Sequence, residues 1–275
     1  MKIYFVRRLV SIAEYCRSGH LPIDTLSDDV LLCIFDSYRL NFYCSQEFVI
    51  SNGWGSWLWH KFVHVCRRWR CIVFAFPVYL DLRLTCRSKT DVERALDIWP
   101  VLPLSIEGDL AYEHLDHIID TLEHRDRMAE IHLGLFNRSQ LKKCTALMQE
   151  PFPVLKILEL EADEGITFVI PDAFLGGSAP LLQWTSLRGI RFQNPPKLLA
   201  SSRDLVYLDL EDIPMTVEGH ISPDAMTTCL SVLTKLQSLS ITFLWQTLSP
   251  PYPTDQRPPS STHTVLPALV KLRLG

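Results

Sequence analysis

Two stretches near the start of the chain carry apolar residues at helical spacing. Residues 25–38 read TLSDDVLLCIFDSY, and residues 59–74 read WHKFVHVCRRWRCIVF. A repeat of three to four residues keeps apolar side chains on one face of a helix, so each stretch is predicted to form one helix. The first stripe consists of Leu26, Val30, Leu31, Ile34, Phe35 and Tyr38, and the second of Leu58, Phe62, Val65, Trp69 and Ile72.

The start of the first helix is marked by Ser27, whose side chain suits the capping position, and by Asp28 and Asp29 in the first turn. Two short helices bury little area, and apolar area contributes only about 25 cal/mol per Å². We therefore expect the pair to depend on the rest of the chain, on a partner, or on both. The connection over residues 40–56 is long, and we interpret it as an insert that packs over the helices or forms an exposed loop.

After Pro77 the apolar pattern alternates between strand and helix periods. Alternating apolar residues predict strands at residues 80–84 and 102–106. Thr90 and Glu93 have the spacing of a capping box, which opens a helix. The expected helices cover residues 91–99, 112–122 and 140–148, and a further one begins at Pro223.

One short apolar motif, which we call a word, then recurs. It consists of an apolar residue, two residues of any type, an apolar residue, one residue of any type, and a last apolar residue. Successive words are separated by 27, 32, 18, 31 and 33 residues. They are Met128/Ile131/Leu133, Leu155/Leu158/Leu160, Leu187/Ile190/Phe192, Leu205/Leu208/Leu210, Leu236/Leu239/Ile241 and Leu269/Leu272/Leu274.

This recurrence of strand and helix is typical of a leucine-rich-repeat solenoid, in which each unit stacks on its neighbour to cover its apolar side. The predicted fold class is therefore α/β, with an irregular solenoid after an N-terminal helical part. Regular repeats place Asn or Cys three residues after the word, and this chain has none there. The corresponding residues are Phe136, Asp163, Pro195, Ile213 and Leu244, and Gly275 directly follows the last word.

The composition of the chain argues against several classes of protein. The 275 residues are 47 % hydrophobic and 21 % charged, which is typical of a globular chain, and the net charge of −4 gives no basic field for nucleic acid or an anionic membrane. The eight cysteines are scattered without a CxxC pair, which favours reduced thiols. Arg7 and Arg8 interrupt the apolar N-terminus, so we read no secretory signal and expect a cytoplasmic or nuclear protein.

Candidate catalytic and metal-binding groups do not converge in the sequence. His60 and His64 have helical ligand spacing with Cys66 nearby, but Lys61 replaces the glutamate of a zinc-peptidase motif. His114, Asp116, His117 and His124 form a second loose cluster, which we interpret as surface residues. Nucleophile elbows and phosphate-binding glycine motifs are absent. We expect no catalytic residue, metal or cofactor.

The two helical stretches together resemble an F-box of the fungal F-box/leucine-rich-repeat-like type. The likeness is carried by residues 26–35, LSDDVLLCIF, and 63–70, VHVCRRWR, and covers about residues 25–75. The V-C-R-x-W motif is intact at Val65, Cys66, Arg67 and Trp69. Ser27 stands where the family has proline.

The resemblance implies a non-catalytic substrate receptor of an SCF-type (Skp–cullin–F-box) ubiquitin ligase. The helices would bind a Skp-type adaptor and, through it, a cullin, while the repeats would bind an unknown substrate protein and no nucleic acid or membrane. An apolar helix face in a partner's groove uses residues at this spacing. The residues expected to share core and adaptor contacts are Leu26, Ser27, Val30, Leu31, Ile34, Phe35, Val65, Cys66 and Trp69.

Two other hypotheses stay open at this point. One is an F-box-like interaction scaffold that enters no ligase, to which Ser27 gives weight. The other is a hydrolase or metal enzyme, for which no convergent residues exist. The expected domains are an extension at 1–20, an F-box at 21–76, and a repeat domain at 77–275 with a Pro/Ser-rich loop at 249–264 and an incomplete C-terminus.

Overall fold

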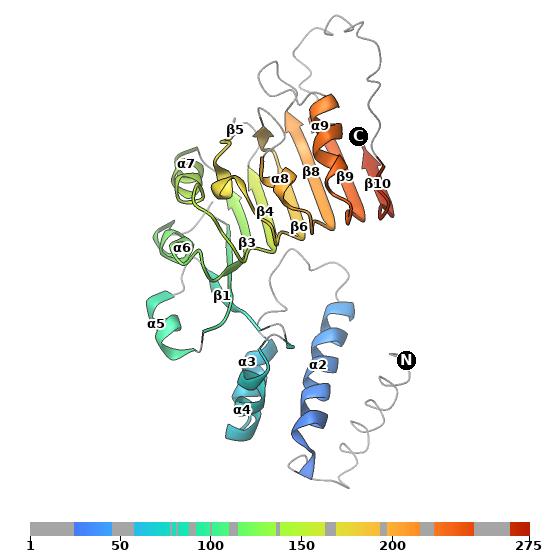
Figure 1. Cartoon of the computed structure of the whole chain (residues 1–275). Coiled ribbons are helices and arrows are strands. Elements are labelled where there is room, and N and C mark those ends of the chain that lie inside the picture. Colours follow the sequence, from blue (N-terminus) through green and yellow to red (C-terminus); the bar gives the residue numbers. More distant parts are fainter. Residues whose placement is uncertain are drawn as a thin grey trace, which may run out of the picture. The chain divides into compact units, whose positions relative to one another are not determined.

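The computed structural model shows a mixed α/β chain with a parallel sheet and several helices (Figure 1). The chain divides into two compact units, each described here by itself. The first unit comprises Met1–Thr85 and Asp97–Pro103, and the second Cys86–Leu96 and Leu104–Gly275. The structure describes residues 25–45, 58–77, 79–80, 82–87, 92–99, 101–109, 115–135, 138–162, 169–192, 197–214, 223–244 and 265–275.

Several expectations fall on other parts of the chain. Outside the described residues lie the extension at 1–20, the Pro/Ser-rich loop at 249–264 and His114. Of the capping pair, Glu93 is described and Thr90 is not. The same holds for residues 46–57 of the predicted insert.

The first unit contains helices α2 (Asp28–Ser45), α3 (Leu58–Val63) and α4 (Arg67–Ala75). Helix α2 starts as its sequence predicts, because the Ser27 hydroxyl accepts a hydrogen bond from the Val30 amide at 3.4 Å. Its helix continues to Ser45, into the segment predicted as an insert from residue 40. The connection between α2 and α3 is therefore shorter than expected.

The prediction of one helix over residues 59–74 is wrong. The helix ends at Val63 and a new one begins at Arg67. Between them Cys66 has extended backbone angles, φ −156° and ψ 171°, and its Sγ accepts a hydrogen bond from the Trp69 amide at 3.5 Å. The thiol thus caps α4, a role that serine or aspartate fills more often.

The main sheet has the strand order β1-β2-β3-β4-β6-β8-β9-β10, and its strands β2 to β10 belong to the second unit. Neighbouring strands from β2 to β10 pair in parallel. The strand predicted at 80–84 begins only at Leu84, because turn hydrogen bonds hold Leu80 and Leu82. The bounds are β1 Leu84–Arg87, β2 Leu104–Asp109, β3 Met128–Leu135, β4 Ile157–Ala162, β6 Trp184–Arg188, β8 Tyr207–Pro214, β9 Ser238–Leu244 and β10 Lys271–Leu274.

Helical segments connect the strands of the main sheet from β1 to β9, and α6 to α9 lie on one face of the sheet (Figure 1). A small parallel pair, β5 (Val169–Ile170) and β7 (Arg191–Phe192), forms a second sheet. No helix in the described residues is long and apolar enough to cross a membrane. The helical segments are α5 Val92–Ile98, α6 Leu115–Leu122, α7 Arg138–Leu147, the 3₁₀ helix η4 Phe174–Gly177, α8 Lys197–Ser201 and α9 Pro223–Ser231.

The core of the second unit lies between the sheet and these helices. Alternate apolar residues of the strands before β10 point to the helices and are buried, as Leu208 and Leu210 are at 0 % exposure. On β10 the residues in register with the inward-facing Leu239 and Ile241 of β9 are Leu272 and Leu274, which are 55 % and 67 % exposed. The apolar side of β10 is therefore uncovered in the described structure.

One predicted repeat word is displaced. The word Leu187/Ile190/Phe192 does not form a single strand. Leu187 lies in β6, which ends at Arg188, Gly189 turns the chain at φ +68°, and Phe192 lies in β7. The structural equivalent is Leu182/Thr185/Leu187, since Thr185 pairs in register with Leu158 and Leu208. The intervals between words become 27, 27, 23, 31 and 33 residues, which is more regular than the sequence pattern predicted.

Candidate functional site

A cluster of aromatic rings forms the core of the helices in the first unit. The Phe35 ring of α2 stacks on Phe62 of α3 at a centroid distance of 4.6 Å, and lies 4.8 Å from Trp69 of α4. Leu31, one turn earlier in α2, is also 0 % exposed. These contacts join all three helices through one face of α2.

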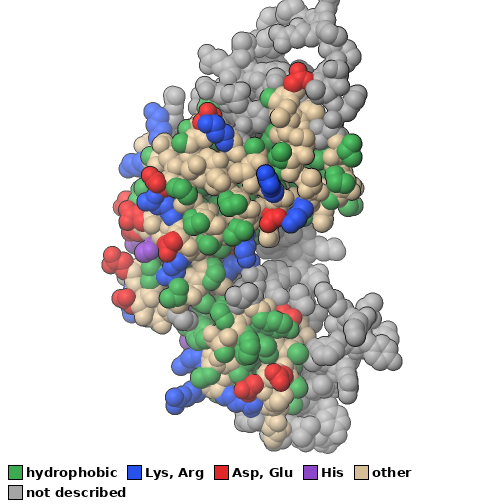
Figure 2. Space-filling view, viewed as in Figure 1, with side chains coloured by type: hydrophobic (Ala, Val, Ile, Leu, Met, Phe, Trp, Pro, Cys, Tyr) green, Lys and Arg blue, Asp and Glu red, His purple; other side chains and the backbone are tan. Residues whose placement is uncertain are grey.

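The nine residues predicted to bind a partner separate into two groups. Leu31 and Phe35 are fully buried, so their side chains serve the core of this unit. Val65 is 57 % exposed at the junction of α3 and α4. Figure 2 shows hydrophobic side chains on the visible surface of these helices. The other seven are exposed or half-buried, and we call them the helical patch. Ser27 and Val65 are exposed. The half-buried members are Leu26, Val30, Ile34, Cys66 and Trp69.

An ion pair holds the start of α2 against α4. The Arg68 guanidinium donates to Asp28 Oδ1 from Nε at 3.0 Å and from Nη2 at 2.7 Å, and also to the backbone oxygen of Leu26. Because Leu26 and Asp28 flank the capping residue Ser27, the arginine fixes the N-terminus of α2. The basic cluster of α4 thus has an internal role in addition to any partner contact.

His60 belongs to a second aromatic cluster and has no geometry of a zinc site. Its ring lies 3.9 Å from Trp59 and 5.1 Å from Trp99 between centroids. Burial, followed by the charge of His64, lowers the pKa of His60 to about 4, so the imidazole is neutral at pH 7. Among the described residues no group of three or more His, Cys, Asp or Glu side chains has metal-binding geometry.

The second unit carries a polar surface that sequence reasoning missed. Side chains on the sheet face opposite the helices form rows across the strands, because neighbouring strands pair in register. We call this surface the outer sheet face. One row contains Ile157, Trp184, Tyr207 and Ser238; the next contains His132, Glu159, Ser186, Asp209 and Ser240; the third contains Glu161, Arg188 and Glu211.

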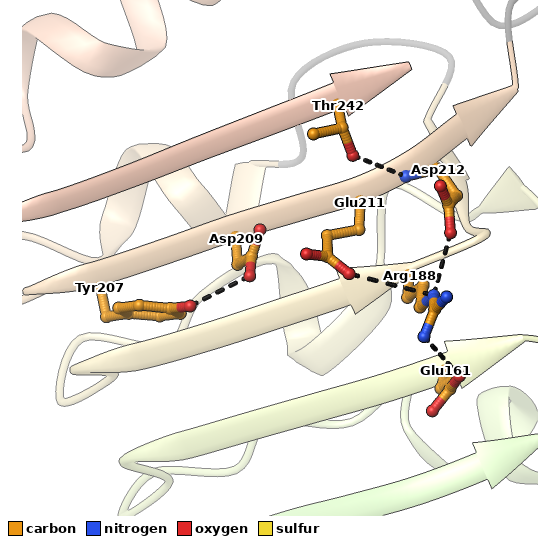
Figure 3. Close-up of polar contacts among 7 residues, drawn as sticks. All are labelled: Glu161, Arg188, Tyr207, Asp209, Glu211, Asp212 and Thr242. Atoms are coloured by element: carbon orange, nitrogen blue, oxygen red, sulfur yellow. Dashed lines mark hydrogen bonds and ion pairs between the residues drawn. The ribbon is translucent and has the colours of Figure 1, made fainter. Parts of the chain in front are cut away.

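Arg188 is the centre of an ion-pair network on this face (Figure 3). Its Nε lies 2.9 Å from Asp212 Oδ2 and 3.9 Å from Glu211 Oε2, and its Nη1 lies 3.2 Å from Glu161 Oε1. Asp212 has φ +53° at the register shift of β8, and its backbone amide donates a hydrogen bond to the Thr242 hydroxyl oxygen at 3.2 Å. Three carboxylates from two strands thus converge on one cation.

His132 is held between two further carboxylates. Its Nδ1 lies 2.7 Å from Glu159 Oε2, and its Nε2 lies 3.9 Å from Glu130 Oε2. Burial, the largest single influence, lowers the pKa of His132, but the hydrogen bonds and charges of Glu130 and Glu159 together outweigh it and raise the pKa to about 9. The imidazole is therefore protonated at pH 7.

Beside these ion pairs lie polar atoms without a partner. The Trp184 and Tyr207 rings stack at a centroid distance of 3.6 Å and an angle of 7°. The Tyr207 hydroxyl donates to Asp209 Oδ2 at 3.0 Å, and burial followed by the Asp209 charge raises its pKa to about 12. Within the described residues, the buried atoms Trp184 Nε1, Asp209 Oδ1 and Ser240 Oγ on this face have no hydrogen-bond partner.

The chain was compared with protein-family models, with curated proteins and with solved structures, and none of the three comparisons finds a match. The arguments about function therefore rest on the geometry of the two surfaces described above.

The sequence contained a weak signal for the outer sheet face. Polar residues occupy the alternate positions of the repeat words, as in Glu159 and Glu161 of β4 or Asp209 and Glu211 of β8. Their neighbours across the strands depend on register, and register depends on correct word boundaries. The sequence pattern places this word at residue 187 instead of residue 182. It therefore does not predict that Trp184 and Arg188 lie beside Tyr207 and Glu211 on the neighbouring strand.

Proposed function

We propose that this chain is a non-catalytic substrate receptor of an SCF-type ubiquitin ligase. The helices of the first unit would be an F-box that binds a Skp-type adaptor, and the strand–helix units of the second a leucine-rich-repeat-like domain that binds the target. The observation that carries the proposal is the helical patch. Leu31 and Phe35 are buried in the core, whereas Val30 and Ile34 of α2 stay half-buried and Val65, between α3 and α4, is exposed.

Apolar side chains that stay partly exposed on small helices favour a protein partner. Helix-in-groove binding uses residues three and four positions apart, and Val30 and Ile34 have that spacing on α2. Val65 adds a further apolar side chain where α3 ends and α4 begins. The receptor would act by proximity, raising the effective concentration of substrate lysines near a ubiquitin-charged enzyme.

The test is binding of the purified chain to a Skp-type adaptor in a pull-down. The double variant Ile34→Asp, Val65→Asp is expected to abolish retention of the adaptor, because two carboxylates would be desolvated in an apolar interface. Neither side chain is fully buried, so the fold should persist, and circular dichroism checks this. Val101→Asp is the matched control, since Val101 is an 84 % exposed valine of the same unit.

Retention of the adaptor by the double variant would reject the proposal, as would equal loss in the Val101→Asp control. A ligase-independent scaffold is the second candidate, favoured by Ser27, which caps α2 where the F-box family has proline. Affinity purification followed by mass spectrometry separates the two functions. A ligase receptor retains both adaptor and cullin, whereas a scaffold retains the adaptor without the cullin.

A further inference from the structure

The unpartnered atoms of the outer sheet face lie close together. Asp209 and Ser240 are direct neighbours across β8 and β9, and Tyr207 joins Asp209 to the ring of Trp184. Neighbouring strands are about 4.8 Å apart, so the three atoms span two strand spacings. Figure 3 shows the second carboxylate oxygen of Asp209 directed away from Tyr207.

These atoms are costly for the protein alone. Asp209 is 8 % exposed and Ser240 is 7 % exposed, so water reaches neither freely. A buried polar group without a hydrogen bond destabilises the fold, and a charged one does so more strongly. Their arrangement on one surface, with one donor, one charged acceptor and one hydroxyl, points to a ligand that supplies the complementary groups.

The surrounding charge favours a cation. Across β3 to β8 the outer sheet face holds more carboxylates than cations, and the cations are already engaged by those carboxylates. The carboxylates end at β8, and on β10 Lys271 and Arg273 continue the rows, with Arg273 in register with Ser240. The carboxylates are Glu130, Glu159, Glu161, Asp209, Glu211 and Asp212, and the cations among them are His132 and Arg188.

We propose that the outer sheet face around Trp184, Asp209 and Ser240 binds an arginine-containing peptide segment of a partner protein. The guanidinium would donate to Asp209 Oδ1, and its plane would lie against the Trp184–Tyr207 stack. Arginine combines planar donors for a carboxylate with affinity for aromatic faces, which lysine matches less well. The peptide backbone would accept a hydrogen bond from Trp184 Nε1 and exchange one with the Ser240 hydroxyl.

This inference gives the chemical class of the substrate for the receptor proposed above, and its biological meaning rests on that proposal. The binding itself requires no adaptor. An assay with the purified full chain and peptide alone therefore succeeds or fails separately from the adaptor pull-down.

The probes are three acetylated heptapeptides, Gly-X-Gly-X-Gly-X-Gly, in which X is arginine, lysine or citrulline. Citrulline keeps the shape of arginine but carries no charge. We expect calorimetric titration to show the tightest binding for the arginine peptide and at least about tenfold weaker binding for the citrulline peptide, because hydrogen bonds between charged groups are lost. The ¹H–¹⁵N signal of the Trp184 indole, assigned with Trp184→Phe, should shift downfield on binding.

Asp209→Asn is the decisive variant, because it keeps the side-chain shape and removes the charge. Its affinity for the arginine peptide should fall at least about tenfold. Asp204→Asn is the matched control in the same unit. This aspartate lies in the turn before β8 and pairs with Lys235 at 2.6 Å, so the affinity of the variant should not change. Trp184→Phe, which keeps an aromatic ring without the Nε1–H, should also weaken binding.

Four results would overturn the inference. They are equal affinities of Asp209→Asn and Asp204→Asn, equal affinities for the arginine and citrulline peptides, equal affinities for the arginine and lysine peptides, and absence of peptide binding. Stacked aromatics with hydroxyl and carboxylate groups also suit sugars, so cellopentaose is titrated in parallel. Its binding in place of the peptides would equally reject a cationic ligand.

Discussion

At the scale of single residues, Thr185 places a hydroxyl group at a position where the neighbouring strands have leucine. It occupies the middle position of its word, where neighbouring strands have Leu158 and Leu208, and it is 0 % exposed. Its Oγ1 has no hydrogen-bond partner in the described structure. The hydroxyl therefore lies in an apolar core without compensation.

Thr185→Val is expected to stabilise the protein. Valine has nearly the same shape and removes the unpaired hydroxyl, whose burial costs about 1 to 3 kcal/mol. Urea unfolding should show a free energy of unfolding higher by about 1 kcal/mol or more. Thr228→Val is a control, because the Thr228 hydroxyl is exposed and bonded to the Asp224 carbonyl at 2.8 Å. An unchanged or lower stability of Thr185→Val would show that the hydroxyl has a partner.

His132 makes the stability depend on pH in a defined direction. Its pKa rises from 6.5 to about 9 in the folded state, so the folded protein holds a proton more tightly than the unfolded chain. The stabilisation is complete below about pH 6.5 and is lost as the pH rises through about 9. At 1.36 kcal/mol per pKa unit its full size is about 3 kcal/mol.

The measurement compares wild type with His132→Gln in urea at pH 6, 7.5 and 9. The difference in unfolding free energy between the two proteins should shrink steadily over this range, because glutamine does not titrate. Other groups titrate equally in both proteins and cancel. A difference that stays constant from pH 6 to 9 would mean that the imidazole between Glu130 and Glu159 is not charged.

At the scale of elements, Gly189 decides where β6 ends. Its φ of +68° suits glycine, and a Cβ there would come within 2.7 Å of the Ala162 carbonyl oxygen. Its amide also donates to the Glu211 carbonyl at 3.0 Å. Both the turn and the close approach to β4 therefore require the absence of a side chain.

Gly189→Ala is expected to destabilise the second unit by about 2 kcal/mol or more, since positive φ and a backbone clash add. Thermal unfolding should record the change. Gly177→Ala is the milder comparison, because it shares a positive φ but its nearest contact would be 3.4 Å. Equal losses for the two variants would show that the clash with Ala162 relaxes at no cost.

The sequence predicts most strands of the sheet, and its two main errors have physical causes. The words beginning at Met128, Leu155, Leu205 and Leu236 lead into strands because their apolar residues face a packed core. At β6 the buried Thr185 hid the true word, and the next apolar residues imitated it. Periodicity alone also gave no sign of the break between α3 and α4, because Val65 continues the helical stripe although it lies outside both helices.

The candidate surfaces differed in how much the sequence could reveal. Helical spacing brought the apolar residues of α2 to one face, but only packing separated Leu31 and Phe35 from Val30 and Ile34. The outer sheet face depends on contacts across strands that are more than twenty residues apart in the chain, as with Arg188 and Asp212. Such contacts follow from loop lengths and register, which one sequence does not specify.

At the scale of the whole sheet, β10 differs from its neighbour β9 in the exposure of its apolar side chains among the described residues. Leu272 and Leu274 are exposed, although their in-register neighbours Leu239 and Ile241 are buried at 3 % and 6 %. An exposed apolar strand at the edge of a sheet favours association and dye binding.

The double variant Leu272→Lys, Leu274→Lys should lower the fluorescence of bound anilinonaphthalene sulfonate and leave the unfolding free energy within about 0.5 kcal/mol, as for other surface changes. Leu181→Lys, a single exposed leucine at 42 %, should change the fluorescence little. A large loss of stability in the double variant would instead mean that these leucines pack in solution.

The parallel register of the sheet has a consequence for how binding preference can change. Outward and inward residues alternate along each strand, so an outward side chain such as Asp209 or Glu211 can be exchanged while Leu208 and Leu210 keep the core intact. Selection or design can therefore replace the outward side chains of this surface one row at a time. Such exchanges would alter the charge and shape of the outer sheet face faster than they alter the fold.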